Sequence, residues 1–331
     1  MTAHFTALRT HQSAAGVISR IEPVTMDDLS AGEVVVKTHY AGVNYKDCLS
    51  IHGQAKIIAQ FPRVAGIELV GEVLESASPE FHCGQQVLVH GFQTGIAFDG
   101  GFAARARVPA AHVQALPEGL TAYEAAILGV PGFTAAMALE RFEALGMTPQ
   151  DGPVAISGAG GAVGLMALTI LARAGWQSAA ITRRMEHTHA LQALGAAEVI
   201  DAAVLQQPQR PLEKARFAAA IDNVGGPMLS WLLRSLQDGG CLASVGNASG
   251  NTFEGSVLPF IMRRVQMFGI VANAPWAQRR HLWARLASDL KPDFDRLVPH
   301  VRHIRLEQLM DHARQQLDGT TSGRVLVVFE D

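Results

Sequence analysis

Four polar residues stand together at positions 44–47, after an alternating apolar segment. Asn44, Tyr45, Lys46 and Asp47 follow EVVVKTHYAGV and precede CLSIHG. An amide, a phenol, an ammonium and a carboxylate in adjacent positions offer hydrogen-bond donors, acceptors and proton-transfer groups. The same residue types also form well-bonded turns, in which Lys46 is an exposed charge and Asp47 caps the turn. The choice between chemistry and a simple turn depends on whether the chain binds a reactant.

A glycine-rich segment, VAISGAGGAVGLMAL, carries the second chemical signal. It follows an apolar strand pattern and opens a helix pattern, which is the context of a dinucleotide-binding turn. Gly158, Gly161 and Gly164 give the spacing GxxGxxG, because Val163 occupies the last glycine position of a strict GxGxxG. A turn that only packs a helix on a strand would show the same glycines.

Glycine suits such a turn for physical reasons. It allows positive φ and a close approach of backbone N–H groups to a pyrophosphate. The helix N-terminus adds about half a positive charge near the phosphates. The residues expected to contact the cofactor here are Ser157, Gly158, Gly160, Gly161, Ala162, Val163 and Gly164.

The residues after the next strand pattern, SAAIT, distinguish between NADH and NADPH. An acidic residue at this place would accept hydrogen bonds from the adenosine ribose of NADH. The chain instead has Thr182, Arg183 and Arg184, and its next carboxylate is Glu186. A guanidinium binds a 2′-phosphate through charge-assisted, bidentate hydrogen bonds, so we expect NADPH. The alternative is a pair of solvated surface arginines.

Composition argues against several other classes of function. The chain has 331 residues, of which 48% are hydrophobic and 17% charged, which suggests about two domains with large cores. The net charge is −3 and no basic run occurs, so nucleic-acid binding is not expected. Three scattered cysteines without a CxxC favour reduced thiols in the cytoplasm. The longest apolar run is interrupted by Arg173, and the N-terminus has no secretory pattern, so no membrane is expected.

The order of the expected elements indicates the fold. The segments before residue 110 are short, β-branched and punctuated by glycine. From Pro153, apolar strands alternate with amphipathic helices, which is typical of a parallel, doubly wound sheet. Between these parts, Thr121 and Glu124 match a helix capping box, and Pro131 is expected to break that helix. The tail GRVLVVFE is again β-like, and we expect it to rejoin the first domain.

Five motifs in order resemble the medium-chain dehydrogenase/reductase superfamily: AGVNYKD, FPRVAGIELVG, PGFTAAMAL, GAGGAVG and AIDNVGG. NYKDCLSIHG, GFTAAMALERFEALGMTPQDG and VLPFIMRRVQMFGI are similar to its quinone-oxidoreductase-like branch, which includes acrylyl-CoA reductases of the YhdH and AcuI type. The resemblance implies an α/β fold. It pairs a GroES-like β-rich catalytic domain, residues 1–122 and 300–331, with a Rossmann NADPH-binding domain, residues 123–299.

The resemblance also implies that no metal is bound. Zinc alcohol dehydrogenases of this superfamily have a cysteine after AG and an aliphatic residue, and a histidine in a GHE segment. Here these places hold Asn44 and Ile67, and no cysteine-rich lobe follows His90. Without zinc to polarise a carbonyl, hydride transfer to an already electrophilic carbon is favoured over alcohol–ketone interconversion.

The implied activity is reduction of the C=C bond of a short α,β-unsaturated acyl-CoA, with acrylyl-CoA giving propionyl-CoA. Asn44 is the candidate for an amide contact to substrate or nicotinamide. Phenols ordinarily have a pKa of about 10 and can donate a proton, so Tyr45 is the candidate for proton donation and substrate binding, or else only packs at the cleft wall. Two other functions fit the same fold: an NADPH:quinone oxidoreductase and a non-catalytic NADPH-binding sensor.

Further contacts are expected at strand ends, because ligands bind at the carboxyl ends of parallel strands. The cofactor contacts expected there are Asn223, Val224, Gly246, Asn247 and Asn273. Thr134 is expected at the nicotinamide carboxamide, or in a hydrogen bond within its own helix. Arg324, at the entrance to the last strand, is the candidate for a CoA phosphate. The resemblance implies a homodimer.

Overall fold

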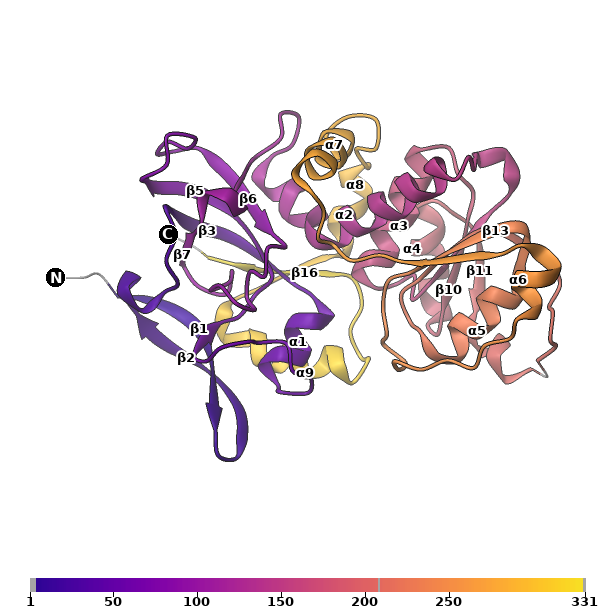
Figure 1. The fold of residues 1–331 in the computed structure, drawn as a ribbon, viewed down its shortest axis with the longest axis horizontal. Helices are drawn as coiled ribbons and strands as arrows, with labels where there is room; N and C mark the ends of the chain where they lie inside the picture. Colours follow the sequence, from indigo (N-terminus) through magenta and orange to yellow (C-terminus); the bar gives the residue numbers. More distant parts are fainter. Residues whose placement is uncertain (1–3, 208, 330–331) are drawn as a thin grey trace. The chain divides into compact units, whose positions relative to one another are not determined.

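The computed structural model describes residues 4–207 and 209–329. The chain divides into two compact units: Met1–Val130 with His300–Asp331, and Pro131–Pro299. The division falls inside α2 (Ala122–Ala144), whereas the sequence placed the domain boundary after residue 122. Figure 1 shows the elements of both units along the chain.

The first unit is built on two sheets. The larger sheet has the strand order β15-β16-β3-β5-β6-β8, with β7 paired to β3. Its strands are β15 (Val301–Ile304), β16 (Arg324–Val328), β3 (Val34–Val43), β5 (Glu68–Ser76), β6 (Gln86–His90), β8 (Gln114–Ala115) and β7 (Arg105–Val108). The smaller sheet joins β2 (Gly16–Val24), β1 (Phe5–Ser13) and β4 (Arg63–Val64). The valines of β3 alternate between buried and partly exposed positions, as expected for a strand with one face in the core.

The C-terminal segment completes this larger sheet. β16 pairs antiparallel with β3, and Val327 lies opposite Ala41. Behind these strands, α1 (Tyr45–Ile51) and α9 (Leu309–Leu317) pack together through one apolar cluster that includes Cys48, Ile51 and Leu309. Residues near both ends of the chain therefore position α1, which begins at the polar segment 44–47.

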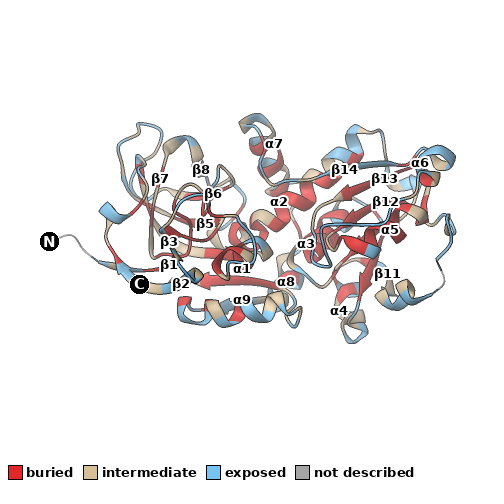
Figure 2. Ribbon diagram, turned by 60° about the horizontal axis from the view of Figure 1, so that its bottom comes forward, coloured by how far each residue is buried: buried red, intermediate tan, exposed pale blue. Residues whose placement is uncertain are grey.

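The second unit contains a parallel six-stranded sheet with the order β11-β10-β9-β12-β13-β14. Its strands are β9 (Val154–Ser157), β10 (Ser178–Thr182), β11 (Ala196–Asp201), β12 (Phe217–Asp222), β13 (Leu236–Ser244) and β14 (Gln266–Gly269). Its helices besides α2 are α3 (Ala162–Arg173), α4 (Thr188–Ala193), α5 (Gly226–Ser235), α6 (Leu258–Arg263), α7 (Trp276–Leu286) and α8 (Phe294–Leu297). β9, β10 and β12 are buried along their whole length, which Figure 2 shows for β12 in red.

The strand order contains a topological switch point. The chain moves from β9 to β10 and β11 on one side, and then returns to place β12 on the other side of β9. Dinucleotides bind across such a point, at the carboxyl ends of the strands. The expected parallel, doubly wound sheet is thus confirmed.

Helix α2 begins as expected, and its break lies two residues before the expected position. Thr121 and Glu124 form the capping box: Thr121 N–H donates to Glu124 Oε2 over 2.8 Å, and Glu124 N–H donates to Thr121 Oγ1 over 3.1 Å. The expected break between two helical stretches is present, but it lies at Gly129, with φ 43° and ψ −147°, and not at Pro131. Pro131 falls in the first turn after this kink, where a missing N–H removes no intrahelical bond.

Helix α2 is also long and apolar enough to cross a membrane, by length and composition alone. It is the one such helix among residues 4–207 and 209–329, and 78% of its most apolar window is buried inside the fold. A buried core helix passes the same test of length and composition.

Candidate cofactor and active-site residues

The glycine turn of the second unit joins β9 to α3. Gly158 has φ 58°, and Gly161 N–H donates to Gly158 O over 2.9 Å. A Cβ added at Gly164 would lie 2.6 Å from both Gly158 O and Ala159 Cα, so only a hydrogen fits there. A Cβ at Gly160 would meet nothing closer than His187 Nδ1 at 3.7 Å. The contacts therefore favour Gly158, Gly161 and Gly164 as the glycines that the turn requires.

A buried network fixes the carboxyl ends of β9 and β12. Ser157 Oγ donates to Asp222 Oδ1 over 2.6 Å, and Asn223 N–H donates to Ser157 Oγ over 2.9 Å. Asp222 also accepts from the N–H groups of Val224, over 3.2 Å, and Gly225, over 2.9 Å. Burial raises the pKa of the Asp222 carboxyl. Sequence reasoning did not single out Asp222, although it ends the strand in the motif AIDNVGG.

The end of β10 presents cationic groups. Thr182 is buried and its Oγ1 accepts from Arg184 N–H over 3.0 Å, while Arg183 is exposed. His187, three residues after Arg184, lies near Gly160. Sequence reasoning missed His187, because only the tertiary structure brings the two together. Asp201, the residue of β11 that pairs with Thr182, accepts from Ala203 N–H over 2.8 Å.

The other residues expected to contact the cofactor differ in their burial and in their contacts. Gly246 packs on the β12 end, because a Cβ there would lie 2.4 Å from Asn223 O. Asn247 is exposed and donates to Asn251 Oδ1 over 2.5 Å. Asn273 is exposed after β14, and Thr134 is buried in α2. The roles of Asn273 and Thr134 stay predictions.

In the first unit, Glu68 and Arg324 form a buried ion pair. Arg324 Nη2 donates to Glu68 Oε1 over 2.8 Å, and the two side chains are 0% and 6% exposed. Arg324 also donates to the backbone carbonyls of Ala126 and Ile127. The expectation that Arg324 binds a CoA phosphate is wrong, because its guanidinium is enclosed and neutralised by Glu68. Sequence reasoning gave Glu68 no role.

The same carboxylate holds two further donors. Asn44 Nδ2 donates to Glu68 Oε1 over 2.7 Å, and Val130 N–H donates to Glu68 Oε2 over 2.7 Å. Gly129 is required here, because a Cβ on it would lie 2.1 Å from Glu68 Oε2. The kink in α2 therefore lies where the buried Glu68 carboxylate leaves no room for a side chain on the helix.

The polar segment 44–47 is partly a helix cap. Asn44 precedes the first residue of α1, and Asp47 Oδ2 accepts from Asn44 N–H over 2.9 Å. Asp47 Oδ1 accepts from Ile67 N–H over 2.9 Å, and burial raises the pKa of Asp47 to about 7. Lys46 is exposed and Tyr45 is half-buried. Asp47 and Asn44 thus support the segment, and Tyr45 carries the hydroxyl left for chemistry.

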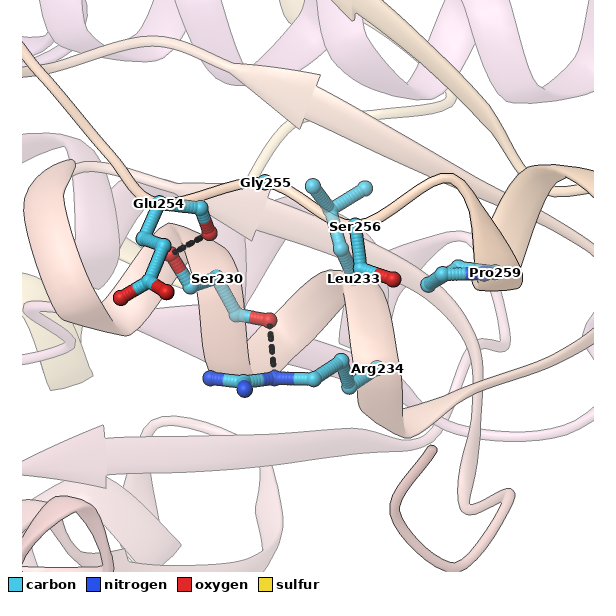
Figure 3. Close-up of a pocket in the computed structure, with 7 residues that line it drawn as sticks. All are labelled: Ser230, Leu233, Arg234, Glu254, Gly255, Ser256 and Pro259. Atoms are coloured by element: carbon cyan, nitrogen blue, oxygen red, sulfur yellow. Dashed lines mark hydrogen bonds between the residues drawn. The ribbon is translucent and has the colours of Figure 1, made fainter. Parts of the chain in front are cut away.

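Two of the hollows in the described part of the second unit are lined by none of the candidate residues. One, of about 60 Å³, is lined by α5 and residues 254–259 (Figure 3). Its Ser230 hydroxyl donates to Glu254 O over 2.6 Å, and Arg234 Nε donates to Ser230 O over 3.0 Å. The other, of about 540 Å³, is an open groove beside β14. We assign neither a role in the chemistry.

Two protein families match the chain. The alcohol dehydrogenase GroES-like domain matches residues 30–118, and the zinc-binding dehydrogenase family matches residues 162–288. These matches define a two-part dehydrogenase fold, with a GroES-like unit and a Rossmann unit.

Relatives that match almost the whole chain define its group within the dehydrogenases more closely. The probable acrylyl-CoA reductase AcuI of Escherichia coli (strain K12) is 37% identical over 323 residues, which cover 97% of this chain and 98% of that protein. The putative quinone oxidoreductase YhfP of Bacillus subtilis (strain 168) is 35% identical and covers 99% of both chains. The chain therefore belongs to the medium-chain dehydrogenase/reductase superfamily, in the group of AcuI- and YhdH-like proteins.

Solved structures agree with this assignment. The yhdH oxidoreductase from Salmonella enterica in complex with NADP gives a TM-score of 0.92 at 37% identity, covering 98% of this chain and 100% of that one. Bacillus subtilis yhfP with NAD bound gives a TM-score of 0.92 at 34% identity, covering 99% and 100%. The expected GroES-like and Rossmann fold is confirmed.

Proposed function

We propose that the chain is a zinc-independent, NADPH-dependent reductase of the C=C bond of a short α,β-unsaturated acyl-CoA, with acrylyl-CoA as substrate and propionyl-CoA as product. The observation that carries the proposal is the glycine turn at residues 158–164, with cationic side chains after β10. The acyl-CoA substrate is supported by two relatives named as acrylyl-CoA reductases, each 37% identical to this chain.

The residues of the second unit fit NADPH. The turn admits no Cβ at Gly164, which keeps the backbone of the turn and the first turn of α3 close together. Backbone N–H groups at such a helix N-terminus bind a pyrophosphate. Arg183 and Arg184 stand at the strand end that receives the adenosine ribose, so they would hold a 2′-phosphate. Asp201, on the neighbouring strand, is engaged with its own backbone.

The donor set of the first unit does not fit zinc. Asn44 donates its amide hydrogen to Glu68, and Ile67 has a hydrocarbon side chain. Cys48 is fully buried, and burial raises the pKa of its thiol, which disfavours a thiolate ligand. Across residues 4–207 and 209–329, no three His, Cys, Asp or Glu side chains are grouped to hold a metal ion.

The chemistry then divides between cofactor and chain. The residues of the glycine turn would hold NADPH, which would supply a hydride for the β-carbon of the unsaturated thioester. One proton from the protein or solvent would then be added at the α-carbon. Tyr45 is the proposed proton donor, since its hydroxyl lies on a half-buried side chain at the start of α1. Asp47 and Glu68 keep the backbone and side chain of Asn44 fixed beside it. In this proposal the residues of segment 44–47 orient and protonate the substrate, and NADPH would supply the reducing hydride.

One assay tests the proposal. NADPH oxidation is followed without oxygen and with a chelator present, against acrylyl-CoA, crotonyl-CoA and a panel of quinones. Turnover of acrylyl-CoA that survives the chelator supports the proposal. Turnover of quinones alone would establish the second candidate, an NADPH:quinone oxidoreductase, which the name of the 35% identical YhfP favours. Binding of NADPH without any hydride transfer would indicate the sensor.

Replacement of both Arg183 and Arg184 by methionine should raise the Kd for NADPH by about 10- to 100-fold, because hydrogen bonds to charged groups contribute about 1.5–3 kcal/mol. The Kd for NADH should stay within about threefold, because NADH lacks the 2′-phosphate. Fluorescence titration measures both constants. Arg173→Met, which removes an exposed charge at the end of α3, is the matched control. A parallel loss of NADH binding would contradict the assignment.

Tyr45→Phe should lower kcat with acrylyl-CoA by about 10²- to 10⁴-fold, which is the usual contribution of a positioned general acid. NADPH affinity should be retained, so the Kd is measured alongside the turnover. Tyr40→Phe, in β3, is the matched control, because it removes a phenol hydroxyl elsewhere in the same unit. Unchanged turnover in Tyr45→Phe removes this residue as the proton donor.

We also propose that the chain forms a homodimer. β14 is an edge strand, and an edge with apolar neighbours is suited to pairing with a second copy. The large exposed apolar residues of α6, β14 and the segments beside them are Val257, Phe260, Ile261, Met262, Met267 and Val271. The mass of the particle in solution, measured by light scattering, tests this assembly; a monomer at micromolar concentration would contradict it.

A further inference from the structure

Asn223 lies between two glycine positions at the carboxyl edge of the parallel sheet. A Cβ built at Gly158 would be 3.6 Å from Asn223 Cβ, and one built at Gly246 would be 2.4 Å from Asn223 O. Asn223 directly follows β12, and Gly158 directly follows β9. The Asn223 side chain therefore lies beside the glycine turn that we propose binds NADPH.

The orientation of the Asn223 amide is fixed by chemistry. Its Nδ2 donates to the carbonyl oxygen of Ser157 over 2.8 Å. A carbonyl oxygen only accepts, so the amide nitrogen must face it and the amide oxygen must face the opposite way. The backbone of Asn223 is held as well, through its N–H bond to Ser157 Oγ.

The amide oxygen is left without a donor from the protein. Asn223 Oδ1 is buried, and no residue in the described part of the chain donates to it. Buried acceptors are normally paired, so an orphan at a ligand-binding edge points to a donor on the ligand. The donors of a dinucleotide are its ribose hydroxyls, its adenine amine and its carboxamide amine.

The strand order selects the half of the dinucleotide. β10, whose end carries Arg183 and Arg184, lies on one side of β9, and β12 lies on the other. A dinucleotide that spans the switch point places its adenosine over the β10 side. Asn223 is on the β12 side, which leaves it the nicotinamide half, and the ribose is the part of that half next to the pyrophosphate held by the turn.

We propose that Asn223 Oδ1 accepts a hydrogen bond from a hydroxyl of the nicotinamide-side ribose of NADPH, and that Asn223 is thereby a positioning residue for the hydride donor. This inference rests on the proposed function. Ser157 and Asp222 act through Asn223: Ser157 holds its amide nitrogen, and Asp222 holds the Ser157 hydroxyl. The network thus connects the ends of two strands to the part of the cofactor that reacts.

The test compares NADPH with 2′,5′-ADP, which carries the adenosine and its 2′-phosphate but no nicotinamide ribose. Asn223→Ala should weaken NADPH binding by about 5- to 50-fold and leave 2′,5′-ADP binding within about twofold, since one buried hydrogen bond is lost on the nicotinamide side only. Gln237→Ala is the matched control, because it removes a side-chain amide of β13 that donates to Arg216 O over 3.1 Å, before the start of β12 and away from the carboxyl edge. It should leave both affinities within about twofold of the unaltered chain.

A second arm needs no variant. Two NADPH analogues are titrated against the unaltered chain, one without the 2′-hydroxyl and one without the 3′-hydroxyl of the nicotinamide-side ribose. One of them should bind about 5- to 50-fold more weakly than NADPH. Equal losses of NADPH and 2′,5′-ADP in Asn223→Ala, or full affinity for both deoxy analogues, would overturn the inference. An unaltered chain that binds neither NADPH nor 2′,5′-ADP would instead overturn the proposed function.

Discussion

Arg324→Met is expected to lower the free energy of unfolding by about 3–5 kcal/mol, because it leaves the Glu68 carboxylate buried without its cation. Asn44 Nδ2 and Val130 N–H remain as donors, but neither carries a charge. Urea titration followed by circular dichroism measures the loss. Guanidinium and carboxylate are both almost fully enclosed, so solvent cannot replace the missing partner.

A double variant separates the ion pair from simple packing. Glu68→Gln in the Arg324→Met background removes the stranded charge and retains an oxygen for Asn44, so part of the lost stability should return. Arg264→Met is the matched control, because Arg264 pairs with Asp238 on the exposed surface and its loss should leave the unfolding midpoint unchanged. An Arg324→Met protein as stable as this control would show that the pair is not a stabilising element.

Gly164→Ala is expected to raise the Kd for NADPH by about 100-fold or more. The added Cβ would lie 2.6 Å from Gly158 O and 2.7 Å from Ala159 O, so helix α3 must move away from the turn. Backbone N–H groups at the helix N-terminus would then miss the pyrophosphate, and each such charge-assisted bond contributes about 1.5–3 kcal/mol. Overpacking should also lower the stability by about 1–3 kcal/mol.

Gly160→Ala is the control within the same turn. The nearest atom to its Cβ would be His187 Nδ1 at 3.7 Å, and Gly160 does not have the positive φ that disfavours alanine. Its stability and its NADPH affinity should stay close to those of the unaltered chain. Equal effects of the two substitutions, in fluorescence titration and in urea unfolding, would contradict the GxxGxxG assignment.

Much of the second unit was predictable because its signals are local. An apolar run, a glycine turn and an amphipathic helix follow one another within residues 154–173, and they form β9, the turn and α3. The expected position of Thr182, Arg183 and Arg184 at the end of β10 also follows from a short, continuous pattern. Local spacing and hydrophobic periodicity determine such units almost completely.

The first unit was harder to predict because its site is made of distant residues. Glu68 and Arg324 are 256 positions apart, and no sequence pattern predicts that they form an ion pair. Arg324 therefore resembled an exposed cation at a strand entrance, which is the usual state of arginine. The kink at Gly129 was missed for the same reason, since the carboxylate that excludes a side chain there comes from β5.

The return of β16 to β3 imposes an order on biosynthesis. Pro131–Pro299 is continuous in sequence, so every strand of its sheet is synthesised before β16 (Arg324–Val328). β3, translated early, must wait for Arg324–Val328 to gain its neighbour, and the Glu68 carboxylate must wait for its cation. During translation, the nucleotide-binding half can mature while the half that carries Tyr45 is still unfinished.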